Sequence, residues 1–233
     1  MIAPPVMLRT EGLAKRFTLH LQGGLQLNVL NNVDLEVRAG ECIALAGPSG
    51  AGKSTLLRSL YGNYRADAGR ILVRHNGGFV DIVSALPRHV VAVREETLGY
   101  VSQFLRVVPR VSALDIVADA ARGLAPDAAR AAAAALLHRL NIPASLHILP
   151  PATFSGGEQQ RINLARGFIG GHPILLLDEP TASLDTANRD VVIAMIREAK
   201  AGGAAIVGIF HDAFVRDAIA DRLYQIAPYQ QAA

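Results

Sequence analysis

Gly47-Pro48-Ser49-Gly50-Ala51-Gly52-Lys53-Ser54 is the stretch that decides the fold, and Thr55 follows it directly. A short apolar run, residues 42–46, precedes this loop, and residues 56–60 after it are typical of a helix. A strand, a glycine-rich turn and a helix in this order form the context that a phosphate-binding loop requires. The glycines let the backbone turn its N–H groups inward, and the start of the helix adds a positive end. The loop therefore predicts a nucleotide site; a plain glycine-rich turn with an exposed lysine is the alternative.

Four side chains, two in the loop and two much later in the chain, have expected roles with phosphate and metal. Lys53 can reach the β- and γ-phosphates, and the Ser54 hydroxyl can ligate Mg²⁺. The apolar run at residues 174–177 leads directly into Asp178 and Glu179. An acidic pair at the end of a buried strand is costly unless a cation or partner compensates it. We therefore expect Asp178 to hold the metal through water and Glu179 to polarise the attacking water. A solvated acidic pair in a loop is the alternative.

Composition excludes several classes of protein. The chain has 233 residues, 51% of them apolar, and a formal net charge of +3, which is too small and too dispersed to indicate nucleic-acid binding. No apolar stretch approaches the ~18 residues of a membrane span, so direct membrane insertion is not expected. Residues 1–5 lack the features of a secretory signal. The single cysteine, Cys42, is expected in the core and fits a reducing compartment, so we expect a cytoplasmic protein.

The first hundred residues favour short strands. Partly alternating apolar segments are punctuated by Gly23-Gly24 and Asn31-Asn32, which suggests antiparallel strands and hairpins. A further hairpin is expected around Asn76-Gly77-Gly78. The predicted strands cover residues 8–13, 17–21, 25–30, 33–37, 70–74, 79–83 and 97–102.

From Ser112 the pattern changes to helices. Helices are predicted to begin at Ser112 and at Pro126, and the second ends at residues 140–143, where asparagine and proline are stop signals. This helical insert continues to about Gly170. Two continuous apolar runs with an amphipathic helix between them follow, which is typical of a parallel sheet covered on both faces. The runs are residues 174–177 and 204–209, the helix is 188–200, and residues 218–230 are expected to be a short, weakly defined tail.

Residues 154–161, Phe-Ser-Gly-Gly-Glu-Gln-Gln-Arg, carry a second signal for an anion. Ser155 and Glu158 have capping-box spacing, so part of this stretch is a helix start. A plain cap does not need Gly156 and Gly157, because consecutive glycines cost helix stability. They make sense if a phosphate approaches the bare helix N-terminus closely. Since one loop already serves one phosphate chain, a second anion site suggests two chains that share two nucleotides.

The chain resembles the ATP-binding-cassette (ABC) ATPases over nearly its whole length. Residues 47–54 match the family's Walker A motif, and residues 174–179 match Walker B with its catalytic glutamate. Residues 154–158 are similar to the LSGGQ signature, with Phe for Leu and Glu for Gln. The remaining matches are Gln103 for the Q-loop, Ser183-Leu184-Asp185 for the D-loop, His211 for the switch histidine and Phe17 near the adenine-stacking aromatic, where a core phenylalanine is the alternative.

The resemblance implies an α/β fold of the P-loop NTPase type. The expected structure is an ABC ATPase nucleotide-binding domain with a mostly parallel sheet core, an antiparallel β subdomain and an α-helical subdomain. Residues 1–233 would form this single domain. About 6–103 and 172–233 would form the RecA-like core with the β subdomain, and about 104–171 the helical signature subdomain.

The resemblance also implies how the site works. Two cassettes pack head to tail, and each ATP, with Mg²⁺, lies between Walker A of one subunit and the signature helix of the other. The partner is thus a second ABC subunit, identical or different. The expected catalytic residues are Glu179, His211 and Gln103, and the expected metal residues are Ser54, Gln103 and Asp178. The expected nucleotide-binding residues are Gly47, Pro48, Ser49, Gly50, Ala51, Gly52, Lys53, Ser54, Thr55, Phe17, Ser155, Gly156, Gly157, Glu158 and Asp185.

Within the family, four stretches are most similar to the PhnL-type cassettes of the phosphonate C–P lyase system. This similarity implies a role in phosphonate catabolism, in the ATP-dependent coupling of a phosphonate to ribose 5-triphosphate, beside the lyase core complex. The alternative is the ATPase subunit of a membrane transporter of the lipoprotein-releasing or macrolide-export type, which also carries the run at 156–161. In that case residues 104–109 would form the groove for a permease helix. A second alternative is an ATP-gated scaffold with little turnover, against which the intact catalytic motifs argue. The four stretches are residues 54–61, 101–110, 154–168 and 204–212.

Overall fold

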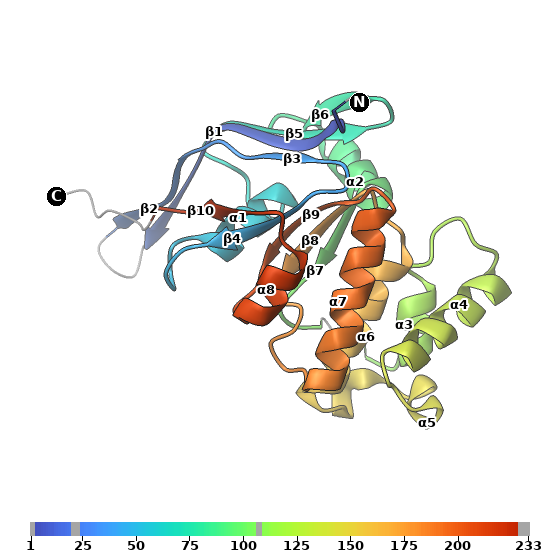
Figure 1. Cartoon of the computed structure of the whole chain (residues 1–233). Helices are drawn as coiled ribbons and strands as arrows, with labels where there is room; N and C mark the ends of the chain where they lie inside the picture. Colours follow the sequence, from blue (N-terminus) through green and yellow to red (C-terminus); the bar gives the residue numbers. More distant parts are fainter. Residues whose placement is uncertain (1–2, 20–23, 106–108, 228–233) are drawn as a thin grey trace.

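The computed structural model of this chain describes residues 3–19, 24–105 and 109–227. The molecule contains two sheets: an antiparallel sheet lies above a parallel one (Figure 1). The helices α3 (Ala113–Ala118), α4 (Pro126–Arg139) and α5 (Ala144–His147) gather at the end farthest from both sheets (Figure 1). Among the described residues, no helix combines the length and apolarity needed to cross a bilayer.

The parallel sheet carries the phosphate loop. Its central strands β8 and β9 are buried along their whole length, as their continuous apolar sequence predicts. On β8, Leu175 and Leu177 belong to one hydrophobic cluster, whereas Ile174 and Leu176 belong to another on the opposite face. Both faces are therefore covered. The strand order is β10 (Arg222–Gln225), β4 (Cys42–Ala46), β9 (Ala205–Ile209), β8 (Ile174–Asp178) and β7 (Leu98–Val101), all parallel.

In the antiparallel sheet, one described strand takes the place of two that the sequence predicts. The segments expected at 8–13 and 17–21 form a single strand, β1, as far as Leu19; residues 20 and 21 lie outside the described part. Shifts in register along β1, and Gly12 at a φ of 57°, keep the strand continuous while it bends. The strands are β1 (Val6–Leu19), β2 (Leu25–Val33), β3 (Glu36–Arg38), β5 (Ala68–His75) and β6 (Gly78–Asp81), in the order β2-β1-β5-β6 with β3 beside β1.

Helices fill the space on both faces of the parallel sheet. Helix α1 (Lys53–Leu60) packs Leu56, Leu57 and Leu60 into the cluster that both sheets share. Its counterparts α6 and α7 pack on the other face, with α3 and α4 beyond them (Figure 1). The predicted starts at Ser112 and Pro126 are confirmed. The helices are α3 (Ala113–Ala118), α4 (Pro126–Arg139), α5 (Ala144–His147), a 3-10 turn (Pro151–Thr153), α6 (Gly156–Ile169), α7 (Thr186–Ala201) and α8 (Ala213–Ile219).

Two elements differ from the sequence expectations. Helix α2 (Pro87–Glu96) was not predicted, because only Val93 is fully buried and no apolar stripe marks the helix. The expected weak tail instead contains the end of α8 and strand β10, which pairs in parallel with β4. This edge strand is held by backbone hydrogen bonds and is too short for a clear alternation; residues 228–230 lie outside the described part.

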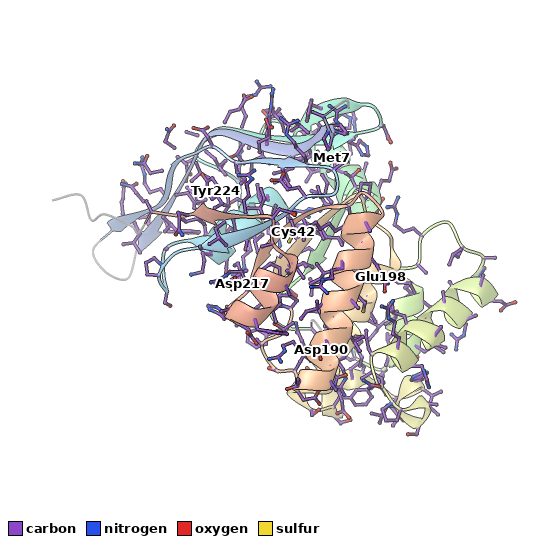
Figure 2. The ribbon with its side chains drawn as sticks, in the orientation of Figure 1. Met7, Cys42, Asp190, Glu198, Asp217 and Tyr224 are labelled. Atoms are coloured by element: carbon purple, nitrogen blue, oxygen red, sulfur yellow. The ribbon has the colours of Figure 1, made fainter. Side chains whose placement is uncertain are left out.

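Cys42 confirms the core position expected for it. Figure 2 labels this residue in the interior, among side chains of the sheet and helices, and it is fully buried. Burial raises the pKa of its thiol to about 12, so the thiolate is not populated near neutral pH.

Candidate active site

The phosphate loop connects β4 to α1. Gly47, Gly50 and Gly52 all have positive φ angles, of 142°, 79° and 96°. A Cβ atom on Gly52 would lie 2.9 Å from both the side chain and the carbonyl of Val29, so only glycine fits there without displacing β2. Lys53 Nζ donates to the carbonyls of Gly47 at 2.8 Å and Pro48 at 2.9 Å. The ammonium is thus held inside the curve of the loop, at the N-terminus of α1.

The start of α1 is suited to an anion. Gly52 is the N-cap and provides no side-chain cap, and the first turn contains no acidic residue. The first backbone N–H groups and the positive end of the helix are therefore not neutralised by the chain itself. Pro48, Ser49 and Gly50 are exposed, so a phosphate chain can reach them from solvent.

Asp178 is the buried carboxylate of the site, only 1% exposed at the end of β8. Ser54 donates its hydroxyl to one carboxylate oxygen at 3.1 Å, and Tyr100 donates to the other at 3.2 Å. Burial raises the pKa of Asp178, and these hydrogen bonds act against that rise. A serine hydroxyl beside a carboxylate whose charge is poorly compensated is a donor set that fits Mg²⁺. Tyr100 was not predicted as a site residue.

Glu179 contacts both of the other residues predicted to be catalytic, Gln103 and His211. Its Oε2 accepts from Gln103 Nε2 at 3.1 Å, and His211 Nε2 lies 2.8 Å from its Oε1. Glu179 also has a φ of 54°, which is uncommon for a residue other than glycine and is a strain found often at functional sites. Gln160 donates to the carbonyl of Pro180 at 3.2 Å and so holds the turn after Glu179.

The signature residues lie apart from the phosphate loop in this chain. Ser155 is the N-cap of α6, and its backbone N–H and hydroxyl both donate to Glu158 Oε2 at 2.8 Å. These hydrogen bonds lower the pKa of Glu158. Ser155 and Gly156 are exposed, and within the described residues no hydrogen bond or ion pair links residues 155–158 to the loop. The capping box is confirmed.

Two other predicted residues have structural contacts within the chain. Asp185 caps α7, where its carboxylate accepts from the backbone N–H of Asn188 at 2.8 Å. Phe17 is half-buried on β1, with its ring edge-on to Tyr64 at 5.3 Å and the Lys15 ammonium 5.2 Å away. The nucleotide contacts expected for Asp185 and Phe17 stay predictions.

Sequence reasoning missed three polar residues that support the site. Besides Tyr100, Gln160 and Asn163 on α6 are almost fully buried, and Asn163 donates to the carbonyl of Ser102 at 2.6 Å, next to Gln103. Gln160 and Asn163 lie about one helical turn from each other, on an otherwise apolar face of α6. Buried polar groups at core positions need partners, so their pattern was the available signal.

Comparison with known proteins identifies the family. Residues 30–182, more than half of the chain, match the family model described as ABC transporter.

The chain belongs to the ABC transporter ATPase family.

This membership confirms the expected enzyme class, an ABC-type ATP hydrolase, and the expected α/β fold. Among its relatives, the lipoprotein-releasing system ATP-binding protein LolD of Shewanella sp. (strain MR-4) is 36% identical over 211 residues, which cover 89% of this chain and 87% of that protein. The macrolide export ATP-binding/permease protein MacB of Sodalis glossinidius is 35% identical over 208 residues. These cover 88% of this chain but 31% of MacB, so the chain spans about a third of that relative.

A solved structure confirms the fold. The ATP-binding cassette MJ0796, a dimer bound to ADP and Pi, superposes with a TM-score of 0.83 at 23% identity, covering 97% of this chain and 98% of that chain. The relatives named here are transporter proteins. They support the broad assignment to ABC ATPases and give no support to the narrower phosphonate interpretation.

Proposed function

We propose that this chain binds ATP with Mg²⁺ at residues 47–55 and hydrolyses it with Glu179 as the group that positions and polarises water. The observation that carries this proposal is the convergence of Gln103 and His211 on the Glu179 carboxylate, beside the buried Asp178. Bound Mg²⁺ would offset the negative charge that builds up on the phosphates. Lys53 would bind the phosphates directly.

Each residue of the site then has a physical task. Ser54 and Asp178 would hold the metal, with Gln103 as a further ligand that also contacts Glu179. His211 would bind the γ-phosphate through a ring nitrogen, and Phe17 would stack on the base. Water attacks the γ-phosphorus, so Glu179 must lie near the end of the phosphate chain, where Gln103 and His211 hold its two oxygens.

Two chains would complete each site. Ser155, Gly156, Gly157 and Glu158 lie at an exposed helix N-terminus, and Asp185 lies at the start of α7. In a head-to-tail pair these residues would face the nucleotide bound by the other chain. Residues 6–103 and 172–233 would act as the nucleotide-binding core and 104–171 as the signature subdomain. The dimeric cassette MJ0796, similar in fold, supports such a pairing.

The relatives favour a membrane transporter as the system that this ATPase drives. LolD is named as a lipoprotein-releasing subunit and MacB as a macrolide exporter, and LolD aligns along most of its length. In this proposal a permease forms the membrane-spanning part of the system, and no helix of the described residues is suited to span a bilayer.

The phosphonate C–P lyase system is the second candidate. It is favoured by the PhnL-like residues 101–110, of which Phe104 is 75% exposed and thus available to a partner; residues 106–108 lie outside the described part. The partner would then be a second cassette and the lyase core complex rather than a permease.

Two measurements test these proposals. Purified protein should release phosphate from ATP in a Mg²⁺-dependent reaction, and it should form pairs when ATP is present; absence of both would overturn the ATPase proposal. To identify the system that the ATPase drives, tagged protein should be recovered, with the proteins bound to it, from cells grown with phosphonate as the only phosphorus source. A detergent-extracted membrane complex supports the transporter, whereas a membrane-free complex of lyase subunits supports the second candidate.

A further inference from the structure

An apolar cavity lies at the end of α1 that is opposite the phosphate loop, where α1 meets strand β5 and helix α2. Its volume is about 410 Å³, which is within the range of pockets that hold small molecules. Ile71 of β5, Ile82 after β6 and Val90 of α2 form apolar walls. Ile71 and Ile82 are buried, whereas Val91 at the same cavity is 47% exposed. The cavity therefore has an apolar interior and opens to solvent beside α2.

One polar group lies deep in this cavity without a partner. Ser59, in the last turn of α1, lines the cavity and is fully buried. Among the described residues, its hydroxyl has no hydrogen-bond partner. Buried polar groups are nearly always hydrogen-bonded, because an unpaired one costs free energy. The hydroxyl is therefore a donor for an oxygen atom that enters the cavity from solvent.

The charged residues at this cavity are both positive. Arg65 and Arg94 line it, and no aspartate or glutamate is among the described residues that do so. Arg65 is exposed, and in the described part of the chain its side chain makes no hydrogen bond or ion pair. Arg94 donates to the carbonyl of Tyr61 at 2.8 Å. This bond orients the Arg94 guanidinium without neutralising it, so the cavity offers two positive charges to an anion.

Gly62 keeps space open where the charged and apolar parts of the cavity meet. It lines the cavity with a φ of 75°, a conformation that favours glycine. A Cβ atom on Gly62 would lie 3.3 Å from both Arg94 Nη2 and Val90 Cγ1. A larger residue would therefore press on the guanidinium and on the valine together. A ligand beside Gly62 can reach both a positive charge and an apolar wall.

We propose that this cavity binds a small carboxylate with an apolar body, whose charged end pairs with Arg65 and Arg94 and whose other end carries an oxygen that accepts from Ser59. Arginine binds carboxylates through its planar fork, and the apolar walls favour a body that leaves water. Inorganic phosphate would use the arginines but leave the walls uncovered. The cavity is at the other end of α1 from the phosphate loop, so this site goes beyond the proposed ATPase function and does not depend on it.

Matched ligands test the proposal by isothermal titration calorimetry of the full chain without nucleotide. Monomethyl suberate has a carboxylate at one end and an ester carbonyl at the other. Dimethyl suberate lacks the charge, and decanoate, with a chain of the same length, lacks the carbonyl. Monomethyl suberate should bind saturably and at least ~10-fold more tightly than dimethyl suberate, a difference of ~1.4 kcal/mol. Lack of saturable binding, or equal affinity for the neutral diester, would overturn the proposal.

The variant Ser59→Ala tests the hydroxyl. Alanine favours a helix more than serine does and removes the unpaired hydroxyl, so the variant should fold. It should bind monomethyl suberate ~5–10-fold more weakly and decanoate with unchanged affinity, because only the ester carbonyl can accept from Ser59. Equal effects on the two ligands would show that the hydroxyl does not meet the ligand, contrary to the proposal.

The variant Arg65→Gln tests the charge, and Arg88→Gln is its matched control. Arg88 also lies near the cavity, on α2, but does not line it. Arg65→Gln should bind monomethyl suberate ~10-fold more weakly, whereas Arg88→Gln should bind it like the unmodified chain. Equal losses in the two variants would indicate general charge attraction and refute the site.

Saturating ADP distinguishes this cavity from the nucleotide site. Monomethyl suberate should bind equally with and without ADP. Full displacement by ADP would place the ligand at the phosphate loop and exclude the proposed site. Phosphate release from ATP is measured separately in the unmodified chain. Its absence would defeat the proposed ATPase function, while the calorimetry would still decide whether the cavity binds carboxylates.

Discussion

Two glutamates, Glu179 and Glu158, each accept hydrogen bonds at a predicted site motif, but the fold supplies their partners in opposite ways. Glu179 is held by Gln103 and His211, which are 76 and 32 residues away in the sequence. Glu158 is held by Ser155, three residues away. The first arrangement exists only once the parallel sheet is folded, whereas the second needs one turn of helix.

This difference divides the predicted site into two parts, which we call the Glu179 half and the Ser155 half. The Glu179 half, with Lys53 and Asp178, is assembled by a single chain. In the Ser155 half, Ser155 and Glu158 satisfy each other's hydrogen bonds, Ser155 and Gly156 are exposed, and within the described residues no hydrogen bond or ion pair links residues 155–158 to the phosphate loop. Variants in the first half should change chemistry and binding in each chain, and variants in the second half should change only what two chains do together.

The largest expected effect is that of Glu179→Gln. Glutamine preserves the shape of the side chain and can still meet Gln103 and His211, but it removes the charge that polarises water. ATP hydrolysis should fall by on the order of 10²–10⁴-fold. ATP binding should persist, and ATP-bound pairs should accumulate, as measured by phosphate release and by size-exclusion chromatography.

Glu198→Gln is the matched control for that variant. Glu198 lies on α7 and makes an exposed ion pair with Arg139 at 2.6 Å, an interaction that contributes little to stability. Hydrolysis by this control should be nearly unchanged. Rapid turnover by Glu179→Gln would contradict the role given to the Glu179 carboxylate.

The next effect belongs to the Ser155 half and is produced by Gly156→Asp. A Cβ atom on Gly156 meets nothing within 4 Å, whereas one on Gly157 would lie 3.0 Å from the carbonyl of Ser183. An acidic residue in the first turn of α6 also favours that helix. The monomer should therefore fold and bind ATP normally, while ATP-dependent pairing weakens by ~10²-fold, since like charges placed together cost several kcal/mol.

Analytical ultracentrifugation with ATP measures this pairing, and Gly78→Asp is the control. Gly78 lies in an exposed hairpin and also has open space around its Cβ position. That control should pair normally. Unchanged pairing in Gly156→Asp would remove the division between the halves, because the Ser155 end would then not face a nucleotide.

A smaller effect is expected for Lys53→Ala. The ammonium now held by the carbonyls of Gly47 and Pro48 would turn to the phosphates, and a hydrogen bond to a charged group contributes ~1.5–3 kcal/mol. ATP affinity should fall by about 10–100-fold in a titration with isolated monomer. Lys200→Ala is the control, since Lys200 lies in the last turn of α7 and pairs with Asp221 at 2.6 Å. Equal affinities of Lys53→Ala and the unmodified chain would place the nucleotide elsewhere.

Local sequence signals made much of the fold and of the candidate site predictable. The glycine-rich loop, the Ser155–Glu158 capping box and the apolar strands at 174–177 and 204–209 depend on neighbours in sequence, and the structure contains all of them. The grouping of Gln103, Glu179 and His211 did not follow from spacing. It was expected only from the resemblance to ABC ATPases.

What escaped prediction depends on tertiary contacts. The hydrogen bond of Tyr100 to Asp178 joins neighbouring strands of the sheet, and β10 is defined by backbone pairing to β4, 179 residues earlier at Arg222 and Ile43. Helix α2 buries too little apolar surface to leave a pattern.

The smallest effect is on stability and concerns Asp178, the buried carboxylate of the Glu179 half. Burial raises the pKa of this carboxyl, so in the folded chain its charged form is disfavoured relative to the unfolded chain. Stability from this group is therefore lost as pH rises through the carboxyl range, and the penalty is full at neutral pH. Asp178→Asn removes the charge, while the hydroxyls of Ser54 and Tyr100 can still hydrogen-bond to the amide.

Without metal or nucleotide at pH 7, Asp178→Asn should raise Tm by about 2–4 °C, the shift that ~1 kcal/mol produces in a chain of this length. The gain should shrink toward acidic pH, because below the unfolded pKa both states of the unmodified chain carry the proton. With saturating Mg²⁺ and ATP the order should reverse, since only the carboxylate gains from the cation. Thermal unfolding across pH measures all three. A variant that is less stable without metal would mean that Asp178 is compensated by the chain alone, and the Glu179 half would then be complete without Mg²⁺.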